Sequence, residues 1–149
     1  MILKLRQRMA QEESGFTLVE LLVVMLILGI LAAIAIPAFL NQREKANDAD
    51  AKADVNTAMQ AMETYQTDNQ GSYAGATVAG LRGIEPALNN ANLAVTGTGG
   101  GGVPTQNAYR VTVTADSTAR TFSIDNNAGT LTYPCAPNGG GCSGATWHP

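Results

Sequence analysis

The stretch that decides the fold lies near the N-terminus and reads Gly15-Phe16-Thr17-Leu18-Val19-Glu20. It is followed by twenty residues, Leu21 to Leu40, without a single charged side chain. A helix rises about 1.5 Å per residue, so this run spans roughly 30 Å, the hydrocarbon thickness of a bilayer. One carboxylate, Glu20, stands at the edge of the run. Residues 16–40 are therefore predicted to form a helix that crosses a membrane.

The segment upstream of this helix, residues 1–15, is expected to be a leader that is removed. It carries three basic residues ahead of the apolar run, which is the charge placement of an export signal. An ordinary secretory signal is cut after its apolar region, whereas here the small-residue junction Ser14-Gly15 precedes that region.

The order of these parts resembles the processing motif of the type IV pilins and the related pseudopilins. The resemblance covers residues 12 to about 70 and is specific at residues 15–20. It implies that a prepilin peptidase cuts between Gly15 and Phe16 and methylates the new N-terminus of Phe16. It also matches Glu20 to the acidic residue that the family carries near its mature N-terminus.

The carboxylate of Glu20 needs a partner or a role, because an acidic group at the centre of a bilayer costs roughly 2.5 to 3.5 kcal/mol, and less near an interface. Cleavage would make Phe16 a positively charged amine one helical turn away. In the family, this glutamate is thought to meet the Phe16 amine of a neighbouring subunit and so set the axial register. The alternative is an interfacial glutamate that faces lipid headgroups.

Gly29 and Pro37 interrupt the apolar helix. Proline inside a helix removes one backbone hydrogen bond and clashes with the preceding turn, so we expect a kink or curvature near Pro37. The stretch from Gly29 to Pro37 is then a candidate for bending or extension under load. Simple tolerance of glycine and proline in a membrane helix explains the same residues equally well.

Residues 41–70 continue the helix as an amphipathic segment, because the composition turns polar without a breaking residue. One apolar stripe recurs at steps of three and four residues and is expected to face the core; it consists of Ala51, Val55, Ala58, Met59, Met62 and Tyr65. Asp48, Asp50 and Asp54 could suggest a cation site, but only Asp50 and Asp54 share a helix face, so the three are interpreted as solvated helix surface. Gly71 is expected to end the helix.

The remaining chain predicts a small head domain. Residues 71–107 are interpreted as a glycine-rich connecting loop, and residues 108–133 as an antiparallel sheet, because three short segments alternate in polarity between turn sequences. The predicted fold class is α+β and pilin-like: a long N-terminal helix, its first half transmembrane, packed on a small antiparallel sheet of three to four strands.

Residues 134–149 form a tail with the only two cysteines, Cys135 and Cys142. If the head lies outside the cytoplasm, these two should pair in a disulfide that closes a small loop. Two unrelated thiols and half of a metal site are the alternatives, and the disulfide is favoured because His148 is the only histidine.

The orientation of the span does not follow from charge, because three basic residues precede it and three follow it. The basic residues concerned are Lys4, Arg6 and Arg8 before the span and Arg43, Lys45 and Lys52 after it. The resemblance and the cysteines place the C-terminal domain outside the cytoplasmic membrane, as a single-pass protein before assembly and as an extracellular pilus afterwards.

The function that this resemblance implies is structural: the major pilin of a type IV pilus, polymerised into a helical filament for adhesion, motility or DNA uptake. The expected partners are copies of itself, the prepilin peptidase, the assembly platform with its ATPase, and the cytoplasmic membrane. The alternatives are a pseudopilin of a type II secretion system and a membrane-anchored binding domain that does not polymerise.

The sequence carries no catalytic, metal-ligand or phosphate-loop motif, and its net charge of −3 does not favour direct nucleic-acid binding. We therefore expect no enzyme activity, no metal and no cofactor.

Overall fold

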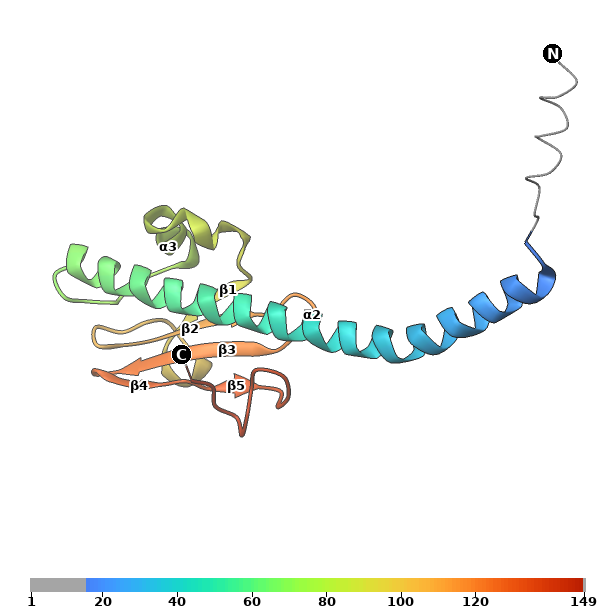
Figure 1. Ribbon diagram of the computed structural model, residues 1–149. Helices are drawn as coiled ribbons and strands as arrows, with labels where there is room; N and C mark the ends of the chain where they lie inside the picture. The colour runs from blue at the N-terminus through green and yellow to red at the C-terminus, as the bar shows by residue number, and fades with distance from the viewer. Residues whose placement is uncertain (1–15, 149) are drawn as a thin grey trace, which may run out of the picture. The chain divides into compact units, whose positions relative to one another are not determined.

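The computed structural model describes residues 16–148, and Figure 1 shows the order of the elements. A division after Leu40 separates an apolar unit from a head unit that begins at Asn41. One helix, α2 (Leu18–Asp68, 51 residues), contributes to both units. The sequence predicted two consecutive helical segments, residues 16–40 and 41–70, and in the structure one continuous helix contains most of both.

The C-terminal end of α2 is closed by left-handed backbone. The Gly71 amide donates to the Gln66 carbonyl at 2.9 Å, and Gln70 and Gly71 have φ of 58° and 83°. Glycine adopts positive φ without a steric cost, which is why it commonly stands just after a helix. The helix ends within a few residues of the predicted stop.

Residues 71–107 were expected to be a connecting loop, and the structure corrects that expectation. This region contains α3 (Val78–Ile84), the 3₁₀ helix η1 (Pro86–Asn90), β1 (Leu93–Thr96) and the 3₁₀ helix η2 (Thr98–Gly100). These elements are too short to show a hydrophobic period, and burial of leucines in the core holds them in place. The leucines are Leu81, Leu88 and Leu93.

The sheet is antiparallel throughout and has five strands, which confirms the α+β fold class but exceeds the three to four strands expected. The strands besides β1 are β2 (Ala108–Thr114), β3 (Thr121–Asn127), β4 (Thr130–Thr132) and β5 (Cys135–Ala136). Their order is β1-β2-β3-β4, and β5 also pairs with β3. The two strands that the pattern did not indicate, β1 and β5, have only four and two residues.

A two-residue turn joins β3 to β4. Ala128 and Gly129 both have positive φ, 51° and 88°, which is the conformation of the tight turn that matches the twist of a hairpin. The Gly129 amide also donates to Asn126 Oδ1 at 2.9 Å. The turn that the sequence predicted here is therefore present, with glycine at one of its left-handed positions.

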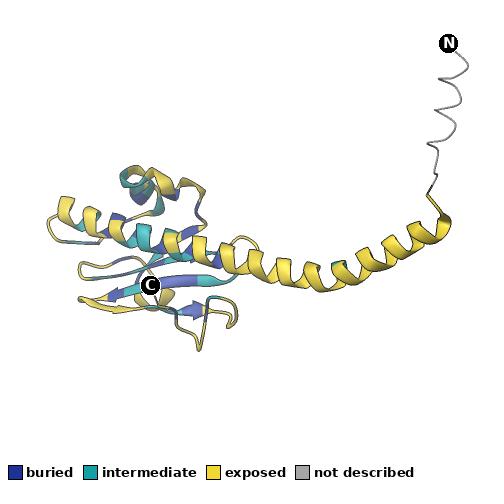
Figure 2. Cartoon of the chain, in the orientation of Figure 1, coloured by how far each residue is buried: buried dark blue, intermediate teal, exposed yellow. Residues whose placement is uncertain are grey.

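The core of the head lies between the last part of α2 and one face of the sheet. Figure 2 shows buried residues on this part of the helix and along the central strands. The predicted helical stripe faces this core: Ala51, Val55, Ala58 and Met62 are buried, and Met59 and Tyr65 pack against them. Strand β2 alternates intermediate and buried residues along its length, as a sheet with one covered face should.

Candidate functional site

The most unusual surface of the described chain is the first half of α2. Every large apolar side chain from Phe16 to Leu40 is exposed, and Figure 2 shows this stretch as a continuous exposed band. Within residues 16–148, α2 is the one helix long and apolar enough to cross a membrane. Contiguous apolar surface of this extent marks a site that a membrane or a protein partner covers.

A reciprocal capping arrangement starts this helix. The Thr17 amide and hydroxyl donate to Glu20 Oε2 at 2.9 and 3.0 Å, and the Glu20 amide donates to Thr17 Oγ1 at 3.2 Å. Such a capping box satisfies backbone donors that the first turn of a helix leaves free. Glu20 is thus engaged within its own chain by one carboxylate oxygen.

Of the other residues predicted for this segment, Gly15 lies outside the described residues, and Phe16 is described and exposed. Gly29 and Pro37 lie inside α2, whose helical assignment continues across both. A Cβ added at Gly29 would meet no atom within 4 Å. The bend expected at Pro37 stays a prediction.

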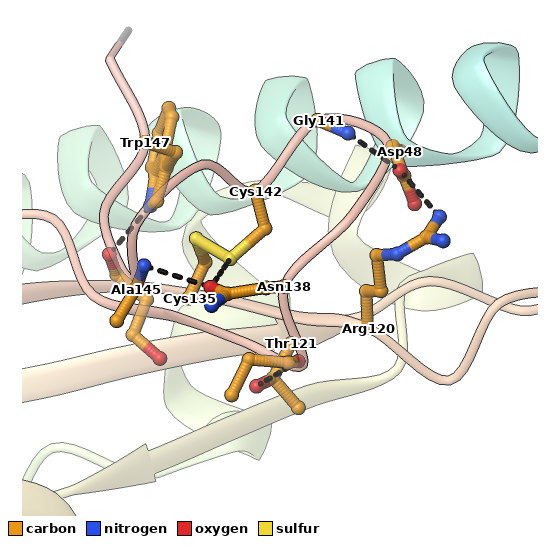
Figure 3. Close-up of a disulfide and its surroundings, with 11 residues drawn as sticks. Asp48, Arg120, Thr121, Cys135, Asn138, Gly141, Cys142, Ala145 and Trp147 are labelled. Atoms are coloured by element: carbon orange, nitrogen blue, oxygen red, sulfur yellow. Dashed lines mark hydrogen bonds and ion pairs between the residues drawn. A yellow bond between two sulfur atoms is a disulfide. The ribbon is translucent and has the colours of Figure 1, made fainter.

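A second site lies where α2 enters the head, around a buried carboxylate. Asp48 is 1% exposed, and Thr118 Oγ1, Arg120 Nη1 and the Gly141 amide donate to it at 2.8, 2.9 and 2.9 Å. Figure 3 shows Arg120 and Gly141 approaching this carboxylate from two different segments. A buried charge must be paired and hydrogen-bonded, and here the donors come from residues 70 to 93 positions away. The interpretation of Asp48 as solvated surface was therefore wrong.

The tail is closed by a disulfide between Cys135 and Cys142, with Cα atoms 5.7 Å apart. Both cysteines are buried, and the loop they enclose supplies the Gly141 amide to Asp48. The disulfide thus belongs to the same junction as the buried carboxylate.

Trp147 fixes the end of the tail. Its ring is 2% exposed and packs edge-on against Phe122 and Tyr133, while Nε1 donates to the Ser123 carbonyl at 2.9 Å. Lys52 Nζ lies 5.7 Å from the Trp147 ring, within cation–π range. Trp147 therefore packs on the sheet of its own chain.

A polar cluster closes the other end of the head. Tyr73 and Tyr109 both donate their hydroxyls to Glu63 Oε1, at 2.9 and 3.2 Å, and Asn126 Nδ2 donates to the Tyr73 hydroxyl. Burial, together with the hydrogen bond to Glu63, raises the pKa of Tyr73 to about 12. Burial and the same carboxylate raise the pKa of Tyr109 as well.

Within residues 16–148, no group of three or more histidine, cysteine, aspartate or glutamate side chains is placed to hold a metal ion. Asp54 lines a small surface pocket with Asp50 and Asp116, and burial followed by these two like charges raises the pKa of its carboxyl. These carboxylates repel one another, and among the described residues they do not form a group that could hold a metal ion.

The roles of two residues, Thr17 and Asp48, were not predicted from the sequence, although each stands at a recognisable spacing. Thr17 stands three residues before Glu20, the spacing of a capping box, which would have placed the helix start. Asp48 stands three residues before Ala51, so it extends the buried stripe by one step. Its charge suggested solvent exposure, whereas its position on the helix face indicated burial.

Comparisons with known proteins match part of the chain, including its N-terminal helix. The family model of the prokaryotic N-terminal methylation motif matches residues 11–36. The chain is 50% identical over 56 residues to the type IV wide pilus major component PilA4 of Thermus thermophilus, covering 38% of this chain and 43% of that protein. It is 41% identical over 59 residues to the type II secretion system core protein G of Pseudomonas aeruginosa, covering 40% and 42%. It is 36% identical over 62 residues to core protein G of Escherichia coli, covering 42% and 43%.

These matches are confined to part of the chain and agree with its α+β fold. A methylation motif that opens a long apolar helix, followed by a small antiparallel head, is the organisation of a pilin-like protein. In this N-terminal part the chain is similar to type IV pilins and type II secretion pseudopilins. The matched stretches span less than half the length of each of these relatives, and among solved structures none matches the chain.

Proposed function

We propose that this chain is the major structural subunit of a type IV pilus and not an enzyme. The observation that carries the proposal is the exposed apolar half of α2, most of which lies within the match to the methylation motif. A single chain cannot cover this surface in water, and both a bilayer and a bundle of identical helices can. The segment then anchors the subunit in the cytoplasmic membrane, with its head outside, and later forms the core of an extracellular filament.

Assembly on this proposal begins with processing by a prepilin peptidase. Cleavage between Gly15 and Phe16 creates an amine on Phe16, which the same enzyme methylates. The carboxylate of Glu20 is one turn further on, and its hydrogen bonds from Thr17 go to Oε2 alone. Oε1 takes no hydrogen bond within the described residues, so it is available to the Phe16 amine of a neighbouring subunit. This ion pair would fix the axial register of the filament.

The other partners follow from the same proposal. They are copies of the chain in a helical homopolymer, and the assembly platform and ATPase that move subunits from the membrane into the filament. Gly29 and Pro37 would give the packed helices a place to bend or extend. We propose no direct contact with nucleic acid.

The test combines electron microscopy of sheared surface material with mass analysis of the N-terminus. The proposal expects abundant filaments made of a chain that begins at a methylated Phe16. Gly15→Val should leave residues 1–15 attached and abolish filaments. Gly29→Ala, a change at another glycine of the same stretch, should leave processing intact. A mature protein that still carries Met1 would contradict the proposal.

A second candidate is a pseudopilin of a type II secretion system, supported by the similarity to core protein G. Such a subunit is cleaved in the same way but builds a short filament in the periplasm. Processed protein without surface filaments, combined with a secretion defect on deletion of the gene, would favour this candidate over the major pilin.

A further inference from the structure

The tail holds the one Asn-Gly pair of the whole sequence, Asn138-Gly139. The pair lies inside the loop that the Cys135–Cys142 disulfide closes, and both residues are exposed to water. Glycine after asparagine is chemically significant because it has no Cβ to hinder its backbone nitrogen.

The reaction open to such a pair is deamidation through a cyclic imide. The backbone nitrogen of Gly139 attacks Cγ of Asn138 and loses its proton, a new C–N bond forms, and the bond from Cγ to Nδ2 breaks so that ammonia leaves. Water then opens the five-membered ring at either carbonyl. The products are aspartate and isoaspartate, the second with one additional carbon in the backbone. The step needs water alone as co-reactant.

Hydrogen bonds in this loop hold both reacting groups. The Gly139 amide donates to the Cys142 carbonyl, and the Cys142 amide donates back to the Gly139 carbonyl, both at 2.9 Å. On the other side of the bond, Asn138 Oδ1 accepts from the Ala145 amide at 2.8 Å (Figure 3). The attacking nitrogen and the attacked carboxamide are therefore each bonded to a different part of the tail.

The disulfide maintains these contacts, because Cys142 is both a half of the disulfide and the partner of Gly139 in the reciprocal pair. Cys142 Sγ also lies 3.9 Å from Asn138 Oδ1. Reaction requires the Gly139 amide to leave the Cys142 carbonyl and the Asn138 side chain to turn away from Ala145. Both movements break hydrogen bonds that the closed loop makes.

We propose that Asn138 is a deamidation site that the disulfide controls: it is spared in the oxidised, folded tail and reacts once the loop opens. Deamidation would place a new carboxylate in the loop whose Gly141 amide donates to Asp48, and isoaspartate would displace that amide from the carboxylate. The disulfide thus protects the Asn138 side chain from deamidation and also holds the fold of the tail. This inference does not depend on the chain being a filament subunit.

The experiment follows the mass of the peptide containing Asn138 during incubation of the detergent-solubilised full chain near neutral pH. Three samples are compared: the oxidised folded chain, the Cys135→Ser/Cys142→Ser double variant, and the oxidised chain unfolded in urea. Deamidation of Asn138 should be at least about tenfold slower in the first sample than in the other two, since reaction requires a local opening of the loop. Asn107 and Asn127, each followed by alanine, serve as internal references.

Two results would overturn the proposal. One is an equal rate at Asn138 in the folded oxidised chain and the urea-unfolded chain, which would mean that the hydrogen bonds give no protection. The other is a double variant that is folded, by the fluorescence of Trp147, yet reacts as slowly as the oxidised chain. Asn138→Gln, whose longer side chain cannot close the five-membered ring, should show no mass gain in any sample and so verifies the assignment.

Discussion

Asp48 and Arg120 form an ion pair, with 2.9 Å between Oδ2 and Nη1, in which the carboxylate is 1% exposed. Asp48 is the first buried residue of α2 along the chain, and Arg120 precedes strand β3. The Gly141 amide of the disulfide loop completes the contact. One carboxylate thereby ties the helix to the β2–β3 turn and to the tail.

Removal of the Asp48 charge should destabilise the head. Asp48→Asn keeps the size of the side chain but removes the nearer counter-charge of the mostly buried Arg120 guanidinium, which keeps only Glu44, a more exposed carboxylate at 3.4 Å. Breaking a buried pair in this way costs up to about 3 kcal/mol. Thermal unfolding of the detergent-solubilised chain, followed through the single tryptophan, measures the loss. Asp50→Asn removes the same charge from an exposed position and should stay within about 0.5 kcal/mol of wild type. Equal effects of the two variants would contradict this account of Asp48.

Stability should fall at alkaline pH because of Tyr73. Its pKa is raised from 10.0 in a free side chain to about 12 in the fold. The folded chain therefore keeps a proton that the unfolded chain releases, and the stabilisation present below pH 10 is lost as the pH rises toward 12. The raised pKa of Tyr109 acts in the same direction.

The measurement is the free energy of unfolding in urea as a function of pH. Tyr73→Phe should reduce the steepness of the alkaline loss while costing some stability at neutral pH, because the hydrogen bond to Glu63 is gone. Tyr65→Phe removes a tyrosine outside this cluster and should leave the wild-type slope. A Tyr73→Phe chain with the wild-type slope would show that this cluster does not control the alkaline limit.

Loss of the disulfide should weaken the tail. A crosslink between residues seven positions apart restricts a short loop of the unfolded chain, which corresponds to about 2 to 3 kcal/mol. The double variant Cys135→Ser/Cys142→Ser should lose about that much in urea unfolding under oxidising conditions. Ser143→Ala, a change at the exposed neighbour of Cys142, is the matched control and should have little effect. Wild type under reducing conditions should match the double variant.

The capping box at the start of α2 should respond to substitution of Thr17. Thr17→Val has nearly the same shape but no hydroxyl, so the first turn loses its cap at a cost of about 1 kcal/mol. Hydrogen exchange at the backbone amides of residues 18–21 in micelles should become faster. Thr17→Ser keeps the hydroxyl and should retain most of the protection. Unchanged exchange in the valine variant would show that the contact with Glu20 does not hold the helix start.

The large elements of the fold were predictable because each has a long or regular pattern. The apolar run and the stripe from Ala51 to Tyr65 predicted α2, and alternation between turn sequences predicted β2, β3 and β4. Helix α3 and strand β1 were not predictable in this way. They consist of seven and four residues, too few for a hydrophobic period to indicate them, and buried leucines such as Leu81 and Leu88 hold this region in place.

The sites, too, were predictable only where their residues lie close together in the sequence. Two cysteines seven residues apart indicated their own pairing. The role of Asp48 was not visible, because its partners Arg120 and Gly141 are 72 and 93 residues away and only the folded chain brings them together. Burial of Trp147 likewise depends on Phe122 and Tyr133, to which no sequence motif connects it.

Strand β3 pairs with both β4 and β5, and this pairing limits how the sheets of neighbouring heads could join. Strands β4 and β5 pair with the same edge of β3 at its two ends, through three and two residues, and β1 at the far edge of the sheet has only four residues. An exposed sheet edge invites another chain to add a strand, and short or interrupted edges discourage it. Heads held side by side at high local concentration therefore have no long edge along which to fuse into an aggregated sheet. In the proposed filament, association would then be left to the helices.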